Sequence, residues 1–248
     1  MAKNKLAKKN NKQGQKEFEQ HQSMLMKLIQ KQEPVHPDLA GYVKAGGIGC
    51  GMVHHPLIVS PIYVKDCYGY VNYLYEQRNA DVQRLMDAEE WKEYVFTHER
   101  PYQLDAFSRI AKRMSDTTYW SILGSVYTES ENLWQQKPKL VCLLTVDRKQ
   151  REFLMNGRER GYLKELPSTL TIYRGYQYRN ANGWSWTLDP KKAHWFAHRF
   201  KGLGGKPTVA TGRVKKRDVV AYFSRRQEKE IVVDPSAVKV TKRETQKL

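Results

Sequence analysis

The chain has 248 residues, 40% of them hydrophobic, which is enough for a buried core in one large domain or two small ones. The longest apolar run, residues 140–146, is interrupted by Thr145 and is far too short to span a membrane. The formal net charge is +17, and residues 1–33 hold only eight Lys against three Glu. Most of the excess positive charge therefore lies in the folded part. It favours anionic partners such as nucleic acid or a nucleotide.

The N-terminus is rich in Lys but lacks the apolar segment and the cleavage site of a secretory signal. The three cysteines, Cys50, Cys67 and Cys142, form an odd number and suggest no disulfide framework. We therefore expect a protein of a reducing cytoplasm.

Residues 1–35 are predicted to be a disordered basic arm, because Lys, Asn, Gln and Glu dominate without an apolar period. The apolar residues between Met24 and Ile29 allow a short amphipathic turn, which Pro34 and Pro37 end. The glycine-rich run at 46–51 is predicted to be a flexible surface loop.

Residues 36–165 are predicted to be a mainly helical lead-in region, since from about residue 66 apolar residues recur at helical spacing. Leu104, Phe107 and Ile110 form one such face, and residues 151–166 read as a single helix. The segment 140–146 is ambiguous between a buried helix and a strand.

After Pro167 the chain is predicted to form strands, because β-branched and aromatic residues alternate with polar ones. The expected strands are Thr169–Tyr173, Trp184–Leu188, Thr208–Val214, Val219–Phe223, Glu230–Val233 and Ala237–Val240. Asp189 and Pro190 start a helix whose apolar face is Ala193, Phe196, Ala197 and Phe200. Helices first and strands later indicate an α+β fold. The strand-rich core at 166–241 is expected to form one structural unit with the helical region. Residues 242–248 are expected to be a basic tail.

Several functional classes lack their sequence signature. The glycine run has no Gly-Lys-Ser/Thr and does not lie between a strand and a helix, as a phosphate-binding loop would. The group Cys50, His54, His55 and Cys67 matches no common zinc spacing, and no glutamate of a metalloprotease motif separates His194 from His198. No Gly-x-Ser-x-Gly elbow surrounds Ser125 or Ser185. We expect no metal site and no serine nucleophile.

Three short stretches then remain, each at or near the start or end of an expected strand: Tyr173-Arg174-Gly175, Ser185-Trp186-Thr187 and Glu228-Lys229-Glu230. An arginine can clamp a pyrophosphate through its planar fork of donors. A glutamate can bind ribose hydroxyls and face a developing positive charge, while a serine hydroxyl holds the site in place. An ordinary surface arginine and an amphipathic strand would look the same, so each stretch alone is weak.

Together these stretches resemble the mono-ADP-ribosyltransferases of the arginine–serine–glutamate, clostridial-toxin-like class, and the run GWSWTLDPKKAHWFAHRF is similar to uncharacterised bacterial and phage members. The resemblance covers about residues 165–241. It departs from the family where Trp186 and Thr187 replace the usual Thr and Ser. It implies a mainly helical N-terminal half packed on a split, mixed or antiparallel C-terminal sheet.

The resemblance also implies the substrate and the roles of single residues. NAD would be bound by Tyr173, Arg174, Gly175, Ser185 and Thr187, with Arg174 on the pyrophosphate and the adenine-side ribose. Ser185 would brace the nicotinamide pocket and position Glu230, which would stabilise the oxocarbenium-like state. Glu228 would orient or deprotonate a macromolecular acceptor, namely a protein in a bacterial or phage-infected host cytoplasm. A glutamate at this place resembles the enzymes of the family that modify arginine.

Two other readings stay open at this point. An NAD glycohydrolase would use the same residues with water as the acceptor. A basic nucleic-acid-binding or virion-associated protein with an inactive site would account for the Lys-rich arm and for the net charge.

Overall fold

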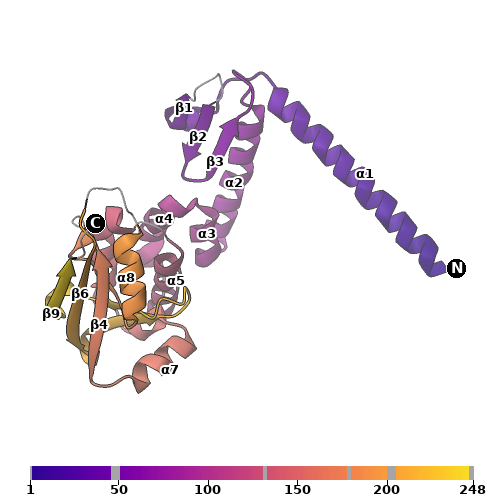
Figure 1. Cartoon of the computed structure of the whole chain (residues 1–248). Coiled ribbons are helices and arrows are strands. Elements are labelled where there is room, and N and C mark those ends of the chain that lie inside the picture. Colours follow the sequence, from indigo (N-terminus) through magenta and orange to yellow (C-terminus); the bar gives the residue numbers. More distant parts are fainter. Residues whose placement is uncertain (1, 46–50, 131–132, 178–179, 200–204, 246–248) are drawn as a thin grey trace. The chain divides into compact units, whose positions relative to one another are not determined.

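The computed structural model describes residues 2–45, 51–130, 133–177, 180–199 and 205–245. The chain divides into two compact units, Met1–Gln103 and Leu104–Leu248 (Figure 1). This differs from the prediction that the whole region 36–165 forms one unit with the strands, because its first part has a small sheet of its own. The predicted flexible loop at 46–51 lies, apart from Gly51, outside the described residues.

A helix, α1 (Ala2–Gln30), replaces the disordered arm predicted for residues 1–35. Its composition explains the difference, because Lys, Gln, Glu and Met lose little rotamer freedom in a helix and no proline precedes Pro34. The end of α1 packs closely on the start of α2 (Gly69–Asp87), where a Cβ added to Gly69 would lie 2.8 Å from the carbonyl oxygen of Leu28.

The first unit also contains a three-stranded antiparallel sheet that the sequence pattern did not indicate. Its strands, in spatial order, are β1 (Val43–Ala45), β2 (Gly51–His55) and β3 (Ile58–Ile62). They are short, and the pair of histidines before Pro56 obscures their alternation. The helix α3 (Trp91–Thr97) packs on α2, and 3₁₀ turns cover Pro37–Tyr42 and Arg100–Tyr102.

The second unit begins with the predicted helices. They are α4 (Gln103–Ile110), α5 (Asp116–Glu129), α6 (Lys137–Leu144) and α7 (Gly157–Glu165), with 3₁₀ turns at Ala111–Arg113, Leu133–Gln136 and Arg151–Leu154. The helix α6 resolves the ambiguous segment in favour of helix. The prediction of one helix over 151–166 is wrong, because Asn156 caps a new helix through a reciprocal capping box with Glu159.

A six-stranded sheet follows, and every neighbouring pair in it is antiparallel. Its spatial order is β7-β8-β5-β4-β6-β9, with β4 (Thr169–Tyr176), β5 (Ser185–Thr187), β6 (Thr208–Lys215), β7 (Val219–Phe223), β8 (Glu230–Val233) and β9 (Lys239–Thr245). The α+β class is thereby confirmed, with an antiparallel rather than a mixed sheet. A 3₁₀ turn at Lys216–Asp218 joins β6 to β7, and one at Pro235–Ala237 precedes β9.

One junction of this sheet is much weaker than the others. Strand β4 pairs with β6 along eight residues but with β5 only at Tyr173↔Thr187. Beyond that pair β4 and β5 diverge, so Arg174 and Ser185 lie where two neighbouring strands separate.

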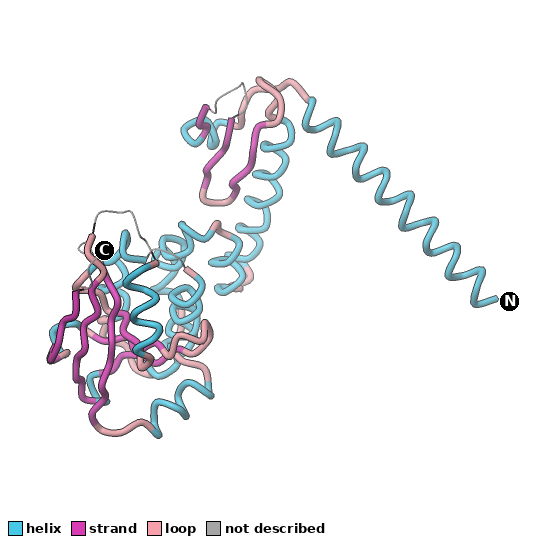
Figure 2. Tube along the Cα trace, viewed as in Figure 1, coloured by secondary structure: helices cyan, strands magenta, loops and turns pink. Residues whose placement is uncertain are grey.

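The helix α8 (Pro190–His198) covers β4 and β6 (Figure 1). Asp189 caps it as predicted, its carboxylate accepting a hydrogen bond from the Lys191 amide at 2.8 Å. Ala193 and Ala197 are fully buried against the sheet. Phe200, predicted on the same face, lies outside the described residues. Figure 2 shows the strands of this unit gathered beside its helices.

Candidate functional site

The three predicted motifs lie on three adjacent strands, β4, β5 and β8. Tyr173 pairs with Thr187, Thr187 with Glu230, and Glu230 with Phe223, so these four residues form one row across the sheet. Directly opposed residues of an antiparallel sheet point to the same face. The fold thus brings the second and third motifs into contact and places the first beside them.

The carboxylate of Glu230 is the centre of the cluster. The hydroxyl of Tyr127, on α5, donates a hydrogen bond to Glu230 Oε1 at 2.8 Å, and the Ser185 hydroxyl also hydrogen-bonds the carboxylate. The ring of Tyr127 stacks on Phe223, with centroids 5.2 Å apart. A helix and two strands therefore hold one carboxylate in a single orientation.

Burial dominates the electrostatics of Glu230. It raises the pKa of the carboxyl above its ordinary value, and the charge of Glu228 raises it further. The hydrogen bonds from Ser185 and Tyr127 and the charge of Arg226 lower the pKa in opposition. Two carboxylates that are close enough to interact, here both partly exposed, can take different pKa values and therefore different roles in catalysis.

Arg174 is tied to the backbone around this cluster. Its guanidinium donates to the carbonyl oxygens of Ser185 and of Asn180, the latter at 2.7 Å. Its Nε is buried and has no hydrogen-bond partner among the described residues. Burial lowers the pKa of Arg174 to about 10, although Tyr127 and Glu230 favour its charged form and act in the opposite direction. The side chain therefore stays charged at neutral pH.

Two of the predicted NAD-binding residues have packing roles in this structure. A Cβ at Gly175 would overlap the carbonyl oxygen of Ala193 and lie 2.6 Å from the Ala197 nitrogen. Only glycine lets α8 approach β4 so closely. Tyr173 packs against the buried cluster of Ala193, Ala197 and Val209.

Thr187 braces the turn that precedes β8. Its hydroxyl donates to the Glu228 carbonyl oxygen at 2.6 Å and accepts from the Asp189 amide at 3.0 Å. The residue is buried, so both functions of the hydroxyl are used inside the protein.

Glu228 lies in this turn, whereas Glu230 is the first residue of strand β8. Gln227 and Lys229 have φ of 55° and 46°, so the backbone between them reverses twice through the left-handed region. Such conformations are costly for residues other than glycine and persist only where surrounding contacts impose them. Glu228 itself remains partly exposed.

The segment just before this turn contacts Glu159, which is fully buried on α7. Its carboxylate accepts from the Ser224 amide at 3.1 Å and pairs with Arg225 at 3.3 Å. Arg226 donates to the Ser130 carbonyl oxygen at 3.2 Å. Residues 224–226, just before the turn that carries Glu228, are thus held by Glu159 and by the Ser130 carbonyl oxygen.

Sequence reasoning missed Tyr127 and Glu159. Tyr127 recurs with Trp120 and Leu123 at helical spacing, a pattern that predicts only an apolar helix face, although a buried tyrosine hydroxyl usually requires a partner. Glu159 carries a recognisable signal, the Asn-x-x-Glu capping box, but that motif does not reveal its second role at the turn.

The histidines and cysteines that were weighed as metal ligands are the remaining candidates. Among the described residues no group of three or more His, Cys, Asp or Glu could hold a metal ion. Cys50 lies outside the described residues, and His198 Nδ1 lies 2.7 Å from the His194 carbonyl oxygen on α8. No helix in the described part of the chain is both long and apolar enough to cross a membrane.

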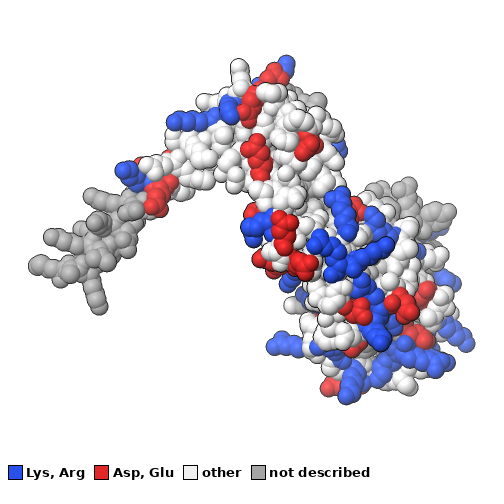
Figure 3. Space-filling model, turned by 180° about the vertical axis from the view of Figure 1, so that it is seen from behind, with Lys and Arg blue, Asp and Glu red and all other residues white. Residues whose placement is uncertain are grey.

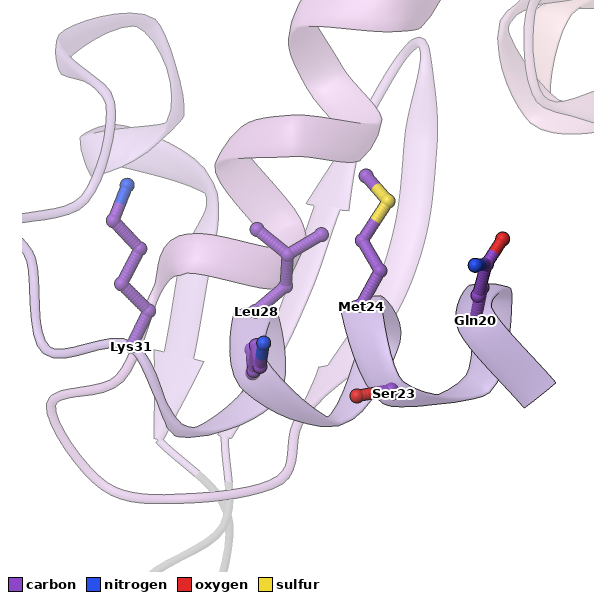
Figure 4. A pocket seen from close by; sticks show the side chains of 6 residues that line it. Gln20, Ser23, Met24, Leu28 and Lys31 are labelled. Atoms are coloured by element: carbon purple, nitrogen blue, oxygen red, sulfur yellow. The ribbon is translucent and has the colours of Figure 1, made fainter.

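One hollow of about 500 Å³ lies in the first unit along α1 (Figure 4). Gln20, Met24, Leu28 and Lys31 project from the same side of the helix, whereas Ser23 points away. It contains none of the predicted site residues.

Replacing Tyr127 by phenylalanine is expected to raise the pKa of Glu230 further, because it removes a donor that stabilises the ionised carboxylate. The measurement is an NMR titration of glutamate carboxyl carbons, with Glu230 assigned by its Gln variant. Tyr119→Phe is the matched control, since that hydroxyl donates to the Leu143 carbonyl oxygen instead. An unchanged pKa of Glu230 in Tyr127→Phe would contradict the assignment.

Comparison with protein-family models, with curated proteins and with solved structures finds no match for this chain.

Proposed function

We propose that this protein is an NAD-dependent mono-ADP-ribosyltransferase, which moves ADP-ribose from NAD to a macromolecular acceptor and releases nicotinamide. The observation that carries the proposal is the convergence on Glu230: Ser185 hydrogen-bonds its carboxylate, and Arg174 interacts with it electrostatically. These three residues are the ones that the family resemblance selects. The carboxylate thus has hydrogen bonds from Tyr127 and Ser185 and a guanidinium within electrostatic reach, which supports the proposal.

The proposed reaction breaks the bond between C1′ of the nicotinamide ribose and the ring nitrogen, and nicotinamide leaves with the electron pair. Positive charge then develops on the ribose. Glu230 would bind the ribose 2′-hydroxyl and stabilise this charge, an effect typically worth about 3–4 kcal/mol per group. The bonds from Tyr127 and Ser185 would keep its carboxylate oriented without reorganisation.

Arg174 and Glu228 would act on the two ends of the reaction. Arg174 stays charged and has a buried Nε without a partner in the described structure, so it has donor capacity for the NAD pyrophosphate. Glu228 would accept the proton that the acceptor nucleophile loses as its bond to C1′ forms. Its partial exposure on a constrained turn suits a group that meets a macromolecule.

The proposal is tested by incubating the full chain with NAD labelled on its adenylate phosphate and with cell lysate. Glu230→Gln is the inactive control. Label on protein supports the proposal, and label on nucleic acid supports transfer to a different acceptor. Label found only as free ADP-ribose would mean NAD hydrolysis, and no release of nicotinamide would refute NAD chemistry altogether.

Glu228→Gln is expected to separate transfer from bond cleavage. Nicotinamide release should persist, because Glu230 keeps its hydrogen bonds from Tyr127 and Ser185, while labelling of the acceptor falls by about 10²-fold, the usual effect of removing a general base. Parallel assays of nicotinamide and of labelled acceptor give the ratio. An equal loss of both would show that Glu228 serves the cleavage step instead.

A further inference from the structure

Trp195 on α8 is the centre of an unusual surface. Its side chain is 52% exposed. The four positions that neighbour it on the helix surface, three and four residues away in each direction, are Lys191, Lys192, His198 and Arg199. Lys192 Nζ lies 5.6 Å and Arg199 Cζ 5.3 Å from the centroid of the indole ring.

The N-cap Asp189 supplies a favourable negative charge at the start of α8, but the two lysines that follow it do not favour the helix. Its first turn contains Lys191 and Lys192 and no acidic residue, although the N-terminal end of a helix favours negative charge. Within the described residues neither lysine has an acidic partner. The cations are attracted to the indole ring, so an exposed aromatic plane and positive charges are presented together, which points to a role in binding.

The charge of the whole unit favours an anionic partner. Residues 104–248 contain 29 Lys and Arg against 14 Asp and Glu, so this unit carries +15 of the net charge of +17. Figure 3 shows one face of the molecule, where Lys and Arg are dense over this unit. Long-range attraction of this sign increases the rate of association with polyanions.

We infer that the exposed face of α8 binds single-stranded nucleic acid, with a base stacked on Trp195 and phosphates on Lys191, Lys192 and Arg199. An indole surrounded by cations provides both parts of such binding, since bases stack on aromatic rings and the backbone binds basic side chains. Paired bases have no free face to stack, so duplexes are weaker ligands. An acidic polypeptide would use the charges but would leave the indole without a partner.

This surface can be tested without affecting the candidate NAD site. The opposite side of α8 buries Ala193 and Ala197 against the sheet, whereas Trp195 and Lys191 point to solvent. The inference does not depend on the proposed transferase activity, because the assay measures binding alone.

The experiment measures fluorescence anisotropy of the full chain with labelled oligothymidylate and oligouridylate of about 15 nucleotides, which is within the usual site size. A duplex of the same length and polyglutamate serve as competitors. Salt is varied from about 50 to 200 mM, because the slope of log affinity against log salt counts the phosphates contacted. The two oligonucleotides distinguish DNA from RNA as the source of the strand.

Trp195→Ala is expected to weaken binding by about 10-fold or more with little change in salt slope, and Trp195→Phe to restore most of it. The double change Lys191→Gln and Lys192→Gln should reduce the slope by about 1.4, since each phosphate on a single strand contributes about 0.7. Tyr63→Ala and Lys164→Gln are the controls, being an exposed aromatic and an exposed lysine elsewhere in the protein.

Three results would overturn the inference. An affinity of Trp195→Ala within twofold of the wild-type affinity would show that no base stacks on Trp195. Equal affinity for duplex and single strand would show binding by charge alone. Efficient competition by polyglutamate would indicate an acidic protein partner. Circular dichroism and thermal unfolding of each variant establish that it is folded.

Discussion

Glu230→Gln is expected to lower the rate of nicotinamide release by about 10²–10³-fold, the usual effect of removing one group that stabilises a developing charge. The amide keeps the size of the side chain and can still accept the hydrogen bond from Tyr127, so the fold is preserved. What is lost is the negative charge facing the ribose. Initial rates at saturating NAD, measured by chromatography of nicotinamide, give the comparison.

The same variant makes a prediction about stability that does not involve NAD. Burial raises the pKa of Glu230, so the folded state holds its proton more tightly than the unfolded state does. The stability of the wild type relative to Glu230→Gln therefore falls as the pH rises from the ordinary carboxyl pKa of 4.5 through the raised pKa of the folded state. Above the raised pKa the difference in stability is constant. Urea unfolding at several pH values measures this.

The two measurements on Glu230→Gln distinguish activity from folding. A variant that is inactive but at least as stable as wild type at neutral pH supports a catalytic role. A rate of nicotinamide release within threefold of the wild-type rate would contradict the catalytic role assigned to Glu230. Loss of cooperative unfolding would instead indicate that the carboxylate mainly holds α5 to the sheet.

Gly175→Ala is expected to destabilise the protein by about 3 kcal/mol, at the upper end of the cost of overpacking. The added Cβ meets the backbone of Ala193 and Ala197, so the whole of α8 must shift away from β4. A flexible side chain could move aside by itself, but these backbone atoms can move only together with the rest of the helix. Urea unfolding monitored by circular dichroism measures the loss.

Gly161→Ala is the matched control for this prediction. Gly161 lies in α7, and nothing is within 4 Å of the position its Cβ would take. The change should stabilise the protein by about 1 kcal/mol through helix propensity. Similar effects of the two substitutions would show that the contact between Gly175 and α8 does not control stability, and that Gly175 is available for ligand binding as first predicted.

Local sequence patterns predicted the second unit well. Strand β7 and strand β8 have the predicted bounds, and the cap at Asp189 is confirmed, because alternation and capping act over a few residues. The small sheet of the first unit was not predicted, because its strands are short and a pair of histidines obscures the alternation of β2. The helix α1 was not predicted because its sequence has no apolar period, although most of its residue types favour a helix.

The sequence by itself determined the α+β class, the order of the strands along the chain and the three residues on which the functional proposal depends. Only the tertiary structure decided how they meet. The pairing of β5 with β8 aligns Thr187 with Glu230, and α5 delivers the hydroxyl of Tyr127, 103 residues away along the chain. Contacts across such distances depend on strand register and helix packing, which no local pattern encodes. For the same reason Gly175, expected to bind NAD, proved to be the point where α8 packs on the sheet.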